Sequence, residues 1–122
     1  MAFDIIIADD DPVVRHILGS VLKAAGHSVE AFASGALLLT GLAARAQAAD
    51  VVFLDLQLGD MTGAELEPEI RKAGAGKTKI VVLTANSESE TKQLYPTLTP
   101  DEFMEKPFTP QTIAELLARL ES

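Results

Sequence analysis

The sequence predicts a doubly wound α/β domain, in which helices cover both faces of a five-stranded parallel sheet. Short runs of β-branched and other apolar residues alternate along the chain with longer amphipathic segments, and this alternation is typical of consecutive βαβ units. Three of the runs contain no polar residue, as expected of strands that are buried on both faces of a sheet. The length of 122 residues fits a single domain, which we expect to span residues 1–122.

Three continuous apolar runs and two weaker patterns predict the five strands. The apolar runs are Ile5–Ala8, Val51–Leu54 and Ile80–Leu83. Ser28–Phe32 alternates weakly between apolar and polar residues, and Glu102–Glu105 is the short candidate for the last strand. Because right-handed crossovers join nearly all neighbouring parallel strands, few arrangements of these strands are possible.

Each of the five expected helices begins at a residue that can cap a helix N-terminus. These starts are Asp11 with Pro12, Ser34, Thr62, Ser87 with Glu90, and Thr109 with Pro110. The first helix should end at Gly26, and the second should cover residues 36–46. Pro96 should end the fourth helix near Tyr95, and Pro68 should kink or shorten the third.

The composition argues against several classes of function. Ten Lys and Arg residues against 18 Asp and Glu residues give a net charge of −8, which disfavours a direct nucleic-acid partner. The sequence has no Cys, which excludes disulfides, thiol chemistry and cysteine zinc sites. No segment has the pattern of a signal peptide or a membrane span, so we expect a cytoplasmic protein without a membrane partner. His16 and His27 belong to no catalytic or metal-binding pattern, and we expect both at the surface.

Polar side chains follow four of the expected strands at the point where each strand ends. Asp9 and Asp10 follow the first strand, Asp55 the third, Thr84 the fourth and Lys106 the fifth. In an open parallel sheet, ligands bind beyond the carboxyl ends of the strands. We therefore expect these five side chains to converge on one edge of the sheet.

Three carboxylates in one small site repel one another, and one of them takes up a proton unless a cation is bound. Mg²⁺ prefers oxygen ligands, uses one or two carboxylates and bridges to phosphate oxygens. A carboxylate beside Mg²⁺ and a lysine is suited to accept a phosphoryl group. Asp11, by contrast, is explained better as a helix cap than as a ligand.

In their order and spacing, four segments resemble the receiver domain of two-component response regulators. They are IIIADDDP with Asp9 and Asp10, VVFLDLQLGDMTG with Asp55, IVVLTAN with Thr84, and FMEKPF with Lys106. The resemblance covers essentially the whole chain. It implies a flavodoxin-like (β/α)5 fold with strand order 2-1-3-4-5, and a phosphoacceptor switch rather than an enzyme.

The resemblance also implies the role of each acidic residue. Asp55 would be the phosphoacceptor. Asp10 and Asp55 would coordinate Mg²⁺ directly, with the backbone carbonyl of Gln57 as the third protein ligand. Asp9 would act on the cation through water.

The remaining matched residues would respond to the phosphoryl group. Lys106 would pair with one phosphoryl oxygen, and Thr84 would move to bond another. Phe103 stands at the position of the switch aromatic, whose rotamer follows the movement of Thr84. In this family the phosphoryl group comes from a histidine kinase or a histidine phosphotransfer protein, which docks near the first helix.

The sequence departs from the family pattern in two loops. Gly59 stands four residues after Asp55, where the family usually has Pro, so we expect a looser loop. Pro100-Asp101 replaces the usual Gly-Ala before the last strand and, with Pro96, makes residues 95–102 atypical. This second departure puts in question the usual output surface, which is formed by the fourth helix, the fifth strand and the fifth helix.

Three alternatives stay open. A phosphohydrolase with an aspartyl-phosphate intermediate typically has a second Asp two residues after the nucleophile, where this chain has Gln57. A pseudo-receiver used only for binding would not need the intact set of five polar residues. Finally, the chain is either a complete regulator or a receiver module of a longer regulator or a hybrid histidine kinase.

Overall fold

The structure, a computed structural model, describes residues 2–121 and contains one five-stranded parallel sheet. The strands are β1 (Asp4–Ala8), β2 (Ser28–Phe32), β3 (Val51–Asp55), β4 (Lys79–Thr84) and β5 (Glu102–Glu105). Their order, β2-β1-β3-β4-β5, and their parallel pairing confirm the predicted doubly wound sheet.

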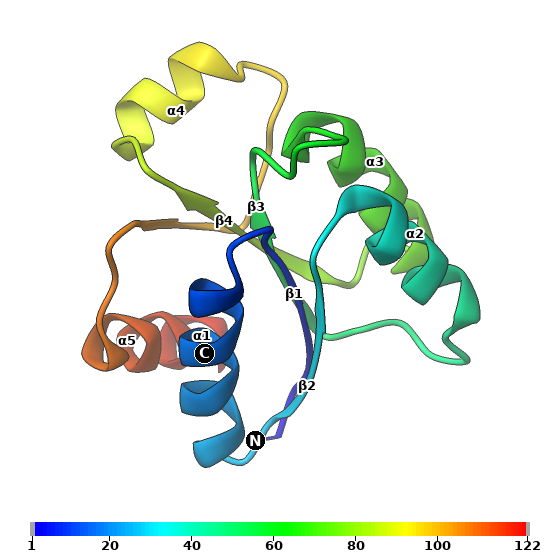
Figure 1. Cartoon of the computed structure of the whole chain (residues 1–122), viewed down its shortest axis with the longest axis vertical. Helices are drawn as coiled ribbons and strands as arrows, with labels where there is room; N and C mark the ends of the chain where they lie inside the picture. The colour runs from blue at the N-terminus through cyan, green and yellow to red at the C-terminus, as the bar shows by residue number, and fades with distance from the viewer. Residues whose placement is uncertain (1, 122) are drawn as a thin grey trace.

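Helices follow each strand and cover the sheet. They are α1 (Pro12–Ala24), α2 (Gly35–Ala44), α3 (Gly63–Ala73), α4 (Glu88–Leu94) and α5 (Pro110–Glu121). Figure 1 shows α1 and α5 together on one side of the sheet, and α2 and α3 together on the other. Within residues 2–121, no helix has the length and hydrophobicity that crossing a membrane requires.

Alternate residues of the central strands pack into two hydrophobic cores, one on each face of the sheet. Ile5 and Ile7 pack with α1 and α5, whereas Ile6 and Ala8 pack with α2 and α3. This division follows from the two-residue period of a strand, which sends neighbouring side chains to opposite faces. The two cores hold the sheet rigidly between its helices, so the strand ends are well placed to carry a site.

The predicted caps begin the described helices, and Pro68 does not shorten α3. Asp11, for example, accepts a hydrogen bond from the backbone N–H of Val13. We expect Pro68 to kink or shorten α3; the helix continues past it to Ala73, and the kink stays a prediction. Leu66 and Ile70, on either side of Pro68, are buried against the sheet, and this packing maintains the helix across the missing N–H.

His27 is buried, which corrects the expectation that it lies at the surface. Its side chain is 7% exposed. Its Nδ1 accepts a hydrogen bond of 2.9 Å from the backbone N–H of Phe3, and the two rings stack with their centroids 5.4 Å apart. His27 therefore fastens the segment before β1 to the turn after α1. His16 is exposed, as expected.

The loop between β3 and α3 is tied to the N-terminus of α2. Gly59 in this loop has a φ of 86°, a left-handed conformation that suits glycine and that proline cannot adopt. The carboxylate of the next residue, Asp60, accepts hydrogen bonds of 2.9 Å from the backbone N–H groups of Gly35 and Ala36. These two bonds hold the pKa of Asp60 below its ordinary value. The expected looseness of this loop stays a prediction.

The atypical segment between α4 and β5 is fastened to α3 and β4. The buried carboxylate of Glu67 accepts a hydrogen bond from the backbone N–H of Thr99. Arg71 donates to the carbonyl oxygen of Thr99 and pairs with Asp101. Asp101 in turn accepts a hydrogen bond from the backbone N–H of Ile80. The segment therefore has a defined course across the end of α3.

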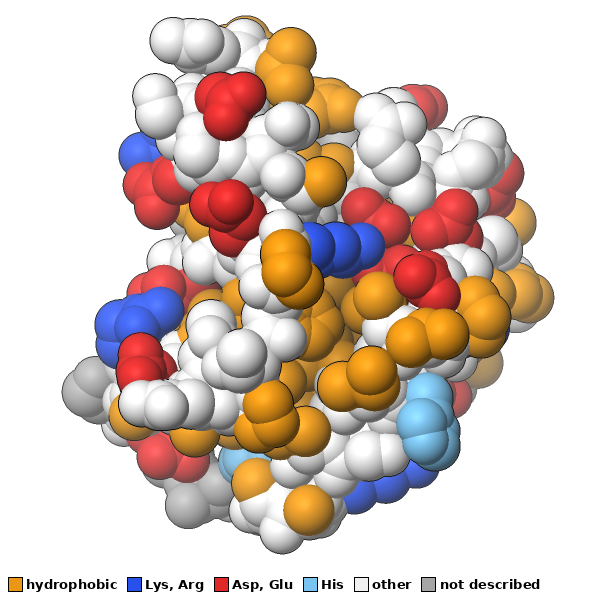
Figure 2. Space-filling view, turned by 60° about the vertical axis from the view of Figure 1, so that its left-hand side comes forward, with side chains coloured by type: hydrophobic (Ala, Val, Ile, Leu, Met, Phe, Trp, Pro, Cys, Tyr) orange, Lys and Arg blue, Asp and Glu red, His pale blue; other side chains and the backbone are white. Residues whose placement is uncertain are grey.

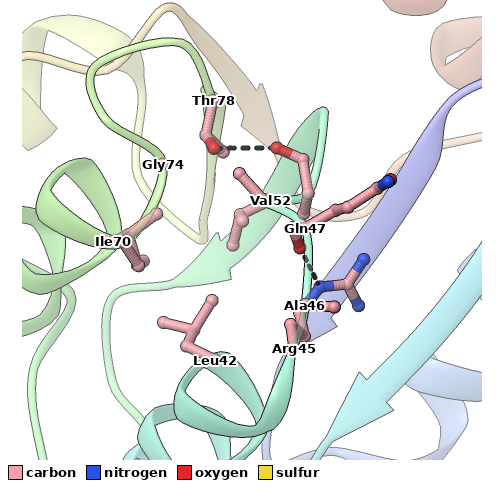
Figure 3. A pocket seen from close by; sticks show the side chains of 11 residues that line it. Leu42, Arg45, Ala46, Gln47, Val52, Ile70, Gly74 and Thr78 are labelled. Atoms are coloured by element: carbon pink, nitrogen blue, oxygen red, sulfur yellow. Dashed lines mark hydrogen bonds between the residues drawn. The ribbon is translucent and has the colours of Figure 1, made fainter.

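A small cavity lies at the opposite edge of the sheet from the expected site, between the loops that precede β3 and β4. Its volume is about 100 Å³, and Leu42 and Ile70 form part of its apolar wall (Figure 3). The Thr78 hydroxyl beside it is already paired, because it donates to the carbonyl oxygen of Ala49. The cavity therefore offers less chemistry than the strand ends.

Replacement of Asp60 tests the tie between the β3–α3 loop and α2. Asp60→Ala should lower the stability at neutral pH, because two helix N–H groups lose their charged acceptor. Since the folded-state pKa is lowered from 3.8, this contribution is present above that value and is lost as the pH falls through the folded-state pKa. Denaturant unfolding of both proteins from neutral to acid pH measures the difference.

Asp60→Asn is the matched control, since it keeps an acceptor oxygen without the charge. At neutral pH it should lose less stability than Asp60→Ala does. Its loss relative to the wild type should also become smaller as the pH falls. A deficit of Asp60→Ala that is equally large at neutral and acid pH would contradict the assignment.

Candidate functional site

The carboxyl ends of the strands bring the predicted site residues to one edge of the sheet. The register pairs Asp55 with Leu83 and Thr84 with Glu105, so β3, β4 and β5 end at nearly the same level. Figure 2 shows acidic side chains gathered around a basic one on the surface, with apolar side chains along one border. The convergence expected from the sequence is therefore present in the fold.

Three carboxylates form the centre of this edge. One oxygen each of Asp9, Asp10 and Asp55 lies within 4.8 Å of the others. Asp9 and Asp55 are buried, whereas Asp10 is exposed. Backbone N–H groups orient the two buried carboxylates: Asp11 donates to Asp9 Oδ1 at 2.9 Å, and Gln57 donates to Asp55 Oδ1 at 3.2 Å. A cation that prefers oxygen ligands fits between them.

Lys106 is the cation that the chain itself supplies to this cluster. Its Nζ lies 2.8 Å from Asp9 Oδ2 and 3.4 Å from Asp55 Oδ2. Burial by itself would lower the pKa of Lys106, but the hydrogen bond to Asp9 and the attraction of both carboxylates outweigh it and raise the pKa. Lys106 is therefore held in its charged form beside Asp55.

The pKa of Asp55 is raised above its ordinary value. Burial is the largest cause, and the negative charge of Asp9 acts in the same direction. The hydrogen bond from the Gln57 backbone and the charge of Lys106 oppose this rise without cancelling it. A single ammonium does not compensate the negative charge of the cluster, so the site favours a further cation.

An open hollow lies beside Asp55. Its volume is about 330 Å³, and its walls include Asp55, Gln57, Thr84, Tyr95 and Lys106. The same space is thus bordered by three residues that the sequence predicts at the ends of three strands: Asp55, Thr84 and Lys106. The hollow can admit a small charged group next to the Asp55 carboxylate.

The hydroxyl of Thr84 is bonded to α4 rather than to Asp55. Thr84 Oγ1 lies 3.0 Å from Thr91 Oγ1, and it accepts a hydrogen bond from the backbone N–H of Asn86. Both threonines are buried, with Thr84 4% exposed and Thr91 fully covered. The structure thus places Thr84 at the site, but with its hydroxyl turned away from the carboxylates.

Phe103 lies outside the acidic cluster. It pairs with Val82 in the sheet and is partly buried against the core beneath α2 and α3. Lys92 Nζ stands 5.7 Å from the centre of its ring, within the range of a cation–π interaction. Phe103 therefore connects β5 with α4, and its role as a switch stays a prediction.

Two contacts of α4 with the site were missed by the sequence reasoning. The side-chain amide of Gln57 donates a hydrogen bond of 2.5 Å to the hydroxyl of Tyr95, a residue that the sequence indicates only as the end of a helix and the start of the atypical segment. Thr91, the partner of Thr84, received no attention in the polar sequence of α4. The available signal was its position four residues after the Ser87 cap, since residues at this spacing lie on the same face of a helix.

The comparisons with known proteins agree with this geometry. The family model for the response regulator receiver domain matches residues 5–118. The probable transcriptional regulatory protein TcrX of Mycobacterium tuberculosis is 30% identical over 116 residues, which are 95% of this chain and 47% of that protein. The DNA-binding response regulator MtrA of Mycolicibacterium smegmatis is 33% identical over 117 residues, 95% of this chain and 50% of that protein. The chain thus spans about half the length of these relatives.

Solved structures of similar fold cover nearly the whole chain. The chemotaxis protein CheY4 of Vibrio cholerae superimposes with a TM-score of 0.86 at 28% identity, covering 98% of this chain and 99% of that one. The receiver domain of the sensor histidine kinase PA1611 of Pseudomonas aeruginosa has a TM-score of 0.85 at 23% identity and full coverage of both chains. That structure holds a magnesium ion in its active site cleft. With the fold, the acidic cluster and the family match in agreement, the chain belongs to the receiver domains of two-component response regulators.

Proposed function

We propose that the chain accepts a phosphoryl group on Asp55 from a histidine kinase or a histidine phosphotransfer protein, and thereby switches the surface that a downstream partner recognises. The observation that carries this proposal is the shared position of Lys106 between Asp55 and Asp9, next to Asp10. The hollow beside Asp55 leaves room for the incoming group.

In the proposed transfer, a carboxylate oxygen of Asp55 attacks the phosphorus of a phosphohistidine. A P–O bond forms, the P–N bond breaks, and the histidine nitrogen keeps the electron pair and takes up a proton. The ammonium of Lys106 neutralises one phosphoryl oxygen, and the hydroxyl of Thr84 donates to another once it turns toward Asp55. Phosphorylation adds about −1.5 to −2 charges to this already acidic site. The phosphorylated conformation is therefore the one in which Lys106 and Thr84 bond the phosphoryl oxygens.

The donor set of the cluster fits Mg²⁺, which we propose as the cofactor. We assign Asp10 and Asp55 as direct ligands, with the Gln57 backbone carbonyl as the third. Asp9 would act through water, as the resemblance to receiver domains implies. Its Oδ2 lies closer to Lys106, at 2.8 Å, than Asp55 Oδ2 does, at 3.4 Å. When bound, the ion neutralises carboxylate and phosphoryl oxygens, which is the main demand of phosphoryl transfer.

We further propose a stoichiometric phosphoacceptor rather than a phosphohydrolase. The residue two positions after Asp55 is Gln57, whose amide cannot act as a general acid or base and is bonded to Tyr95. The net charge of −8 supports a protein partner over direct nucleic-acid contact. We place the chain in the cytoplasm, acting alone or with an output or kinase module, since its relatives include longer regulators and a hybrid histidine kinase.

The phosphorylation site is tested by labelling with a small phosphodonor. Incubation of the purified chain with acetyl phosphate and Mg²⁺ should add one phosphoryl group per molecule, detected by intact-mass spectrometry. Asp55→Asn should abolish the label, because the amide is a poor nucleophile. Asp11→Asn, which keeps the helix cap and lies outside the cluster, should retain it. Undiminished labelling of Asp55→Asn would refute the assignment.

The metal assignment is tested by titration with Mg²⁺. Asp10→Asn should weaken binding by about tenfold or more, since even outer-shell partners of a metal change its affinity by about that factor. Asp11→Asn removes the same charge at the adjacent position but should leave the affinity within about twofold, because Asp11 caps α1. Isothermal titration calorimetry measures both, and equal losses in the two variants would argue against direct ligation by Asp10.

Removal of a carboxylate should stabilise the metal-free protein. Burial and the charge of Asp9 raise the folded-state pKa of Asp55, so ionised Asp55 costs stability, increasingly as the pH rises through that pKa. In a chelator at neutral pH, Asp55→Asn should therefore unfold at a higher temperature than the wild type. The difference in unfolding temperature between the two proteins should become smaller at acid pH and in excess Mg²⁺. A lower unfolding temperature of Asp55→Asn in chelator would show that Lys106 already compensates the cluster.

A further inference from the structure

The contact between Thr84 and Thr91 joins the phosphorylation site to α4 through two buried hydroxyls. Their oxygens lie 3.0 Å apart, and solvent reaches neither side chain appreciably. Each hydroxyl has one proton to donate and can accept from others. The direction of the bond between them follows from the other partners of each group.

The partners show that Thr84 is the donor in this bond. The hydroxyl of Thr91 lies 2.8 Å from the carbonyl oxygen of Ser87, a group that can only accept, so Thr91 donates its proton there. The backbone N–H of Asn86 donates to Thr84 Oγ1 at 3.1 Å. Since Thr91 has no second proton, the proton between the two hydroxyls belongs to Thr84.

We propose that Thr91 is a positioning residue that holds the single hydroxyl proton of Thr84 away from Asp55 and so stabilises the unphosphorylated conformation. The inference rests on the proposed role of Thr84 as a donor to the phosphoryl group. Phosphoryl oxygens are acceptors, so Thr84 can bond them only with the proton that it now gives to Thr91. The two bonds exclude each other.

The same geometry keeps the restraint weak enough to be released. When Thr84 turns away, Thr91 still donates to Ser87, and the carbonyl of Ser87 also accepts from the backbone N–H of Thr91. Release of Thr84 therefore breaks one hydrogen bond to Thr91, and the hydroxyl proton of Thr91 keeps its acceptor. Because Thr91 lies within α4, release of Thr84 removes one of the contacts that hold this helix to β4.

The test compares the affinity of variants for fluoroberyllate, a non-covalent mimic of the phosphoryl group, in the presence of saturating Mg²⁺. Thr91→Val keeps the side-chain shape but removes the acceptor, so it should bind fluoroberyllate roughly three- to tenfold more tightly, the effect of one net hydrogen bond. Thr91→Ser keeps the acceptor and should stay close to the wild type. Mg²⁺ affinity should be the same in all three proteins.

Two further variants make the outcome decisive. Thr91→Ala also lacks the acceptor and replaces Thr91→Val if the valine does not fit. In a Thr84→Val background, Thr91→Val should have no effect on fluoroberyllate affinity, because the proton in question is gone. Equal or weaker binding by the hydroxyl-free variants would overturn the role of Thr91, provided that the wild type binds. Failure of the wild type to bind fluoroberyllate would instead overturn the proposed function.

Discussion

The mutual repulsion of three carboxylates at one edge of the sheet is the constraint on which the rest of this structure depends. Asp9 and Asp55 are buried beside Asp10, and Lys106 faces the two buried groups. Burial strengthens the repulsion because little water screens it. The same excess of negative charge is the reason for the cation, and through it the phosphoryl group, that we propose at this site.

Such a site requires a scaffold that does not yield to the repulsion. The central strands β1 and β3 are packed on both faces, with Ile5 and Ile7 in one core and Ile6 and Ala8 in the other. Close packing of this kind resists small displacements. The carboxylates are therefore held together, against their repulsion, by the packing of the domain as well as by Lys106.

The short helix α4 and its C-terminal end make two contacts with residues beside the acidic cluster. This helix has seven residues and ends before Pro96. Thr91 holds the hydroxyl of Thr84, and Tyr95 meets the amide of Gln57. Both contacts join groups beside the acidic cluster to one short helix and its C-terminal end. Under the proposed function, a change in charge at Asp55 would reach α4 through these two contacts.

The sequence by itself determined the strands, the helix starts, the strand order and the convergence of Asp55 with Lys106, since these follow from local patterns and from the family's motif spacing. Only the tertiary structure decided that His27 is buried, that Asp60 accepts from the first N–H groups of α2 and that the Thr84 hydroxyl is bonded to Thr91. The reason is physical. A polar side chain forms a hydrogen bond with a group that tertiary packing places within about 3 Å. The sequence pattern alone is compatible with several such partners, and the packing of the helices against the sheet selects one of them.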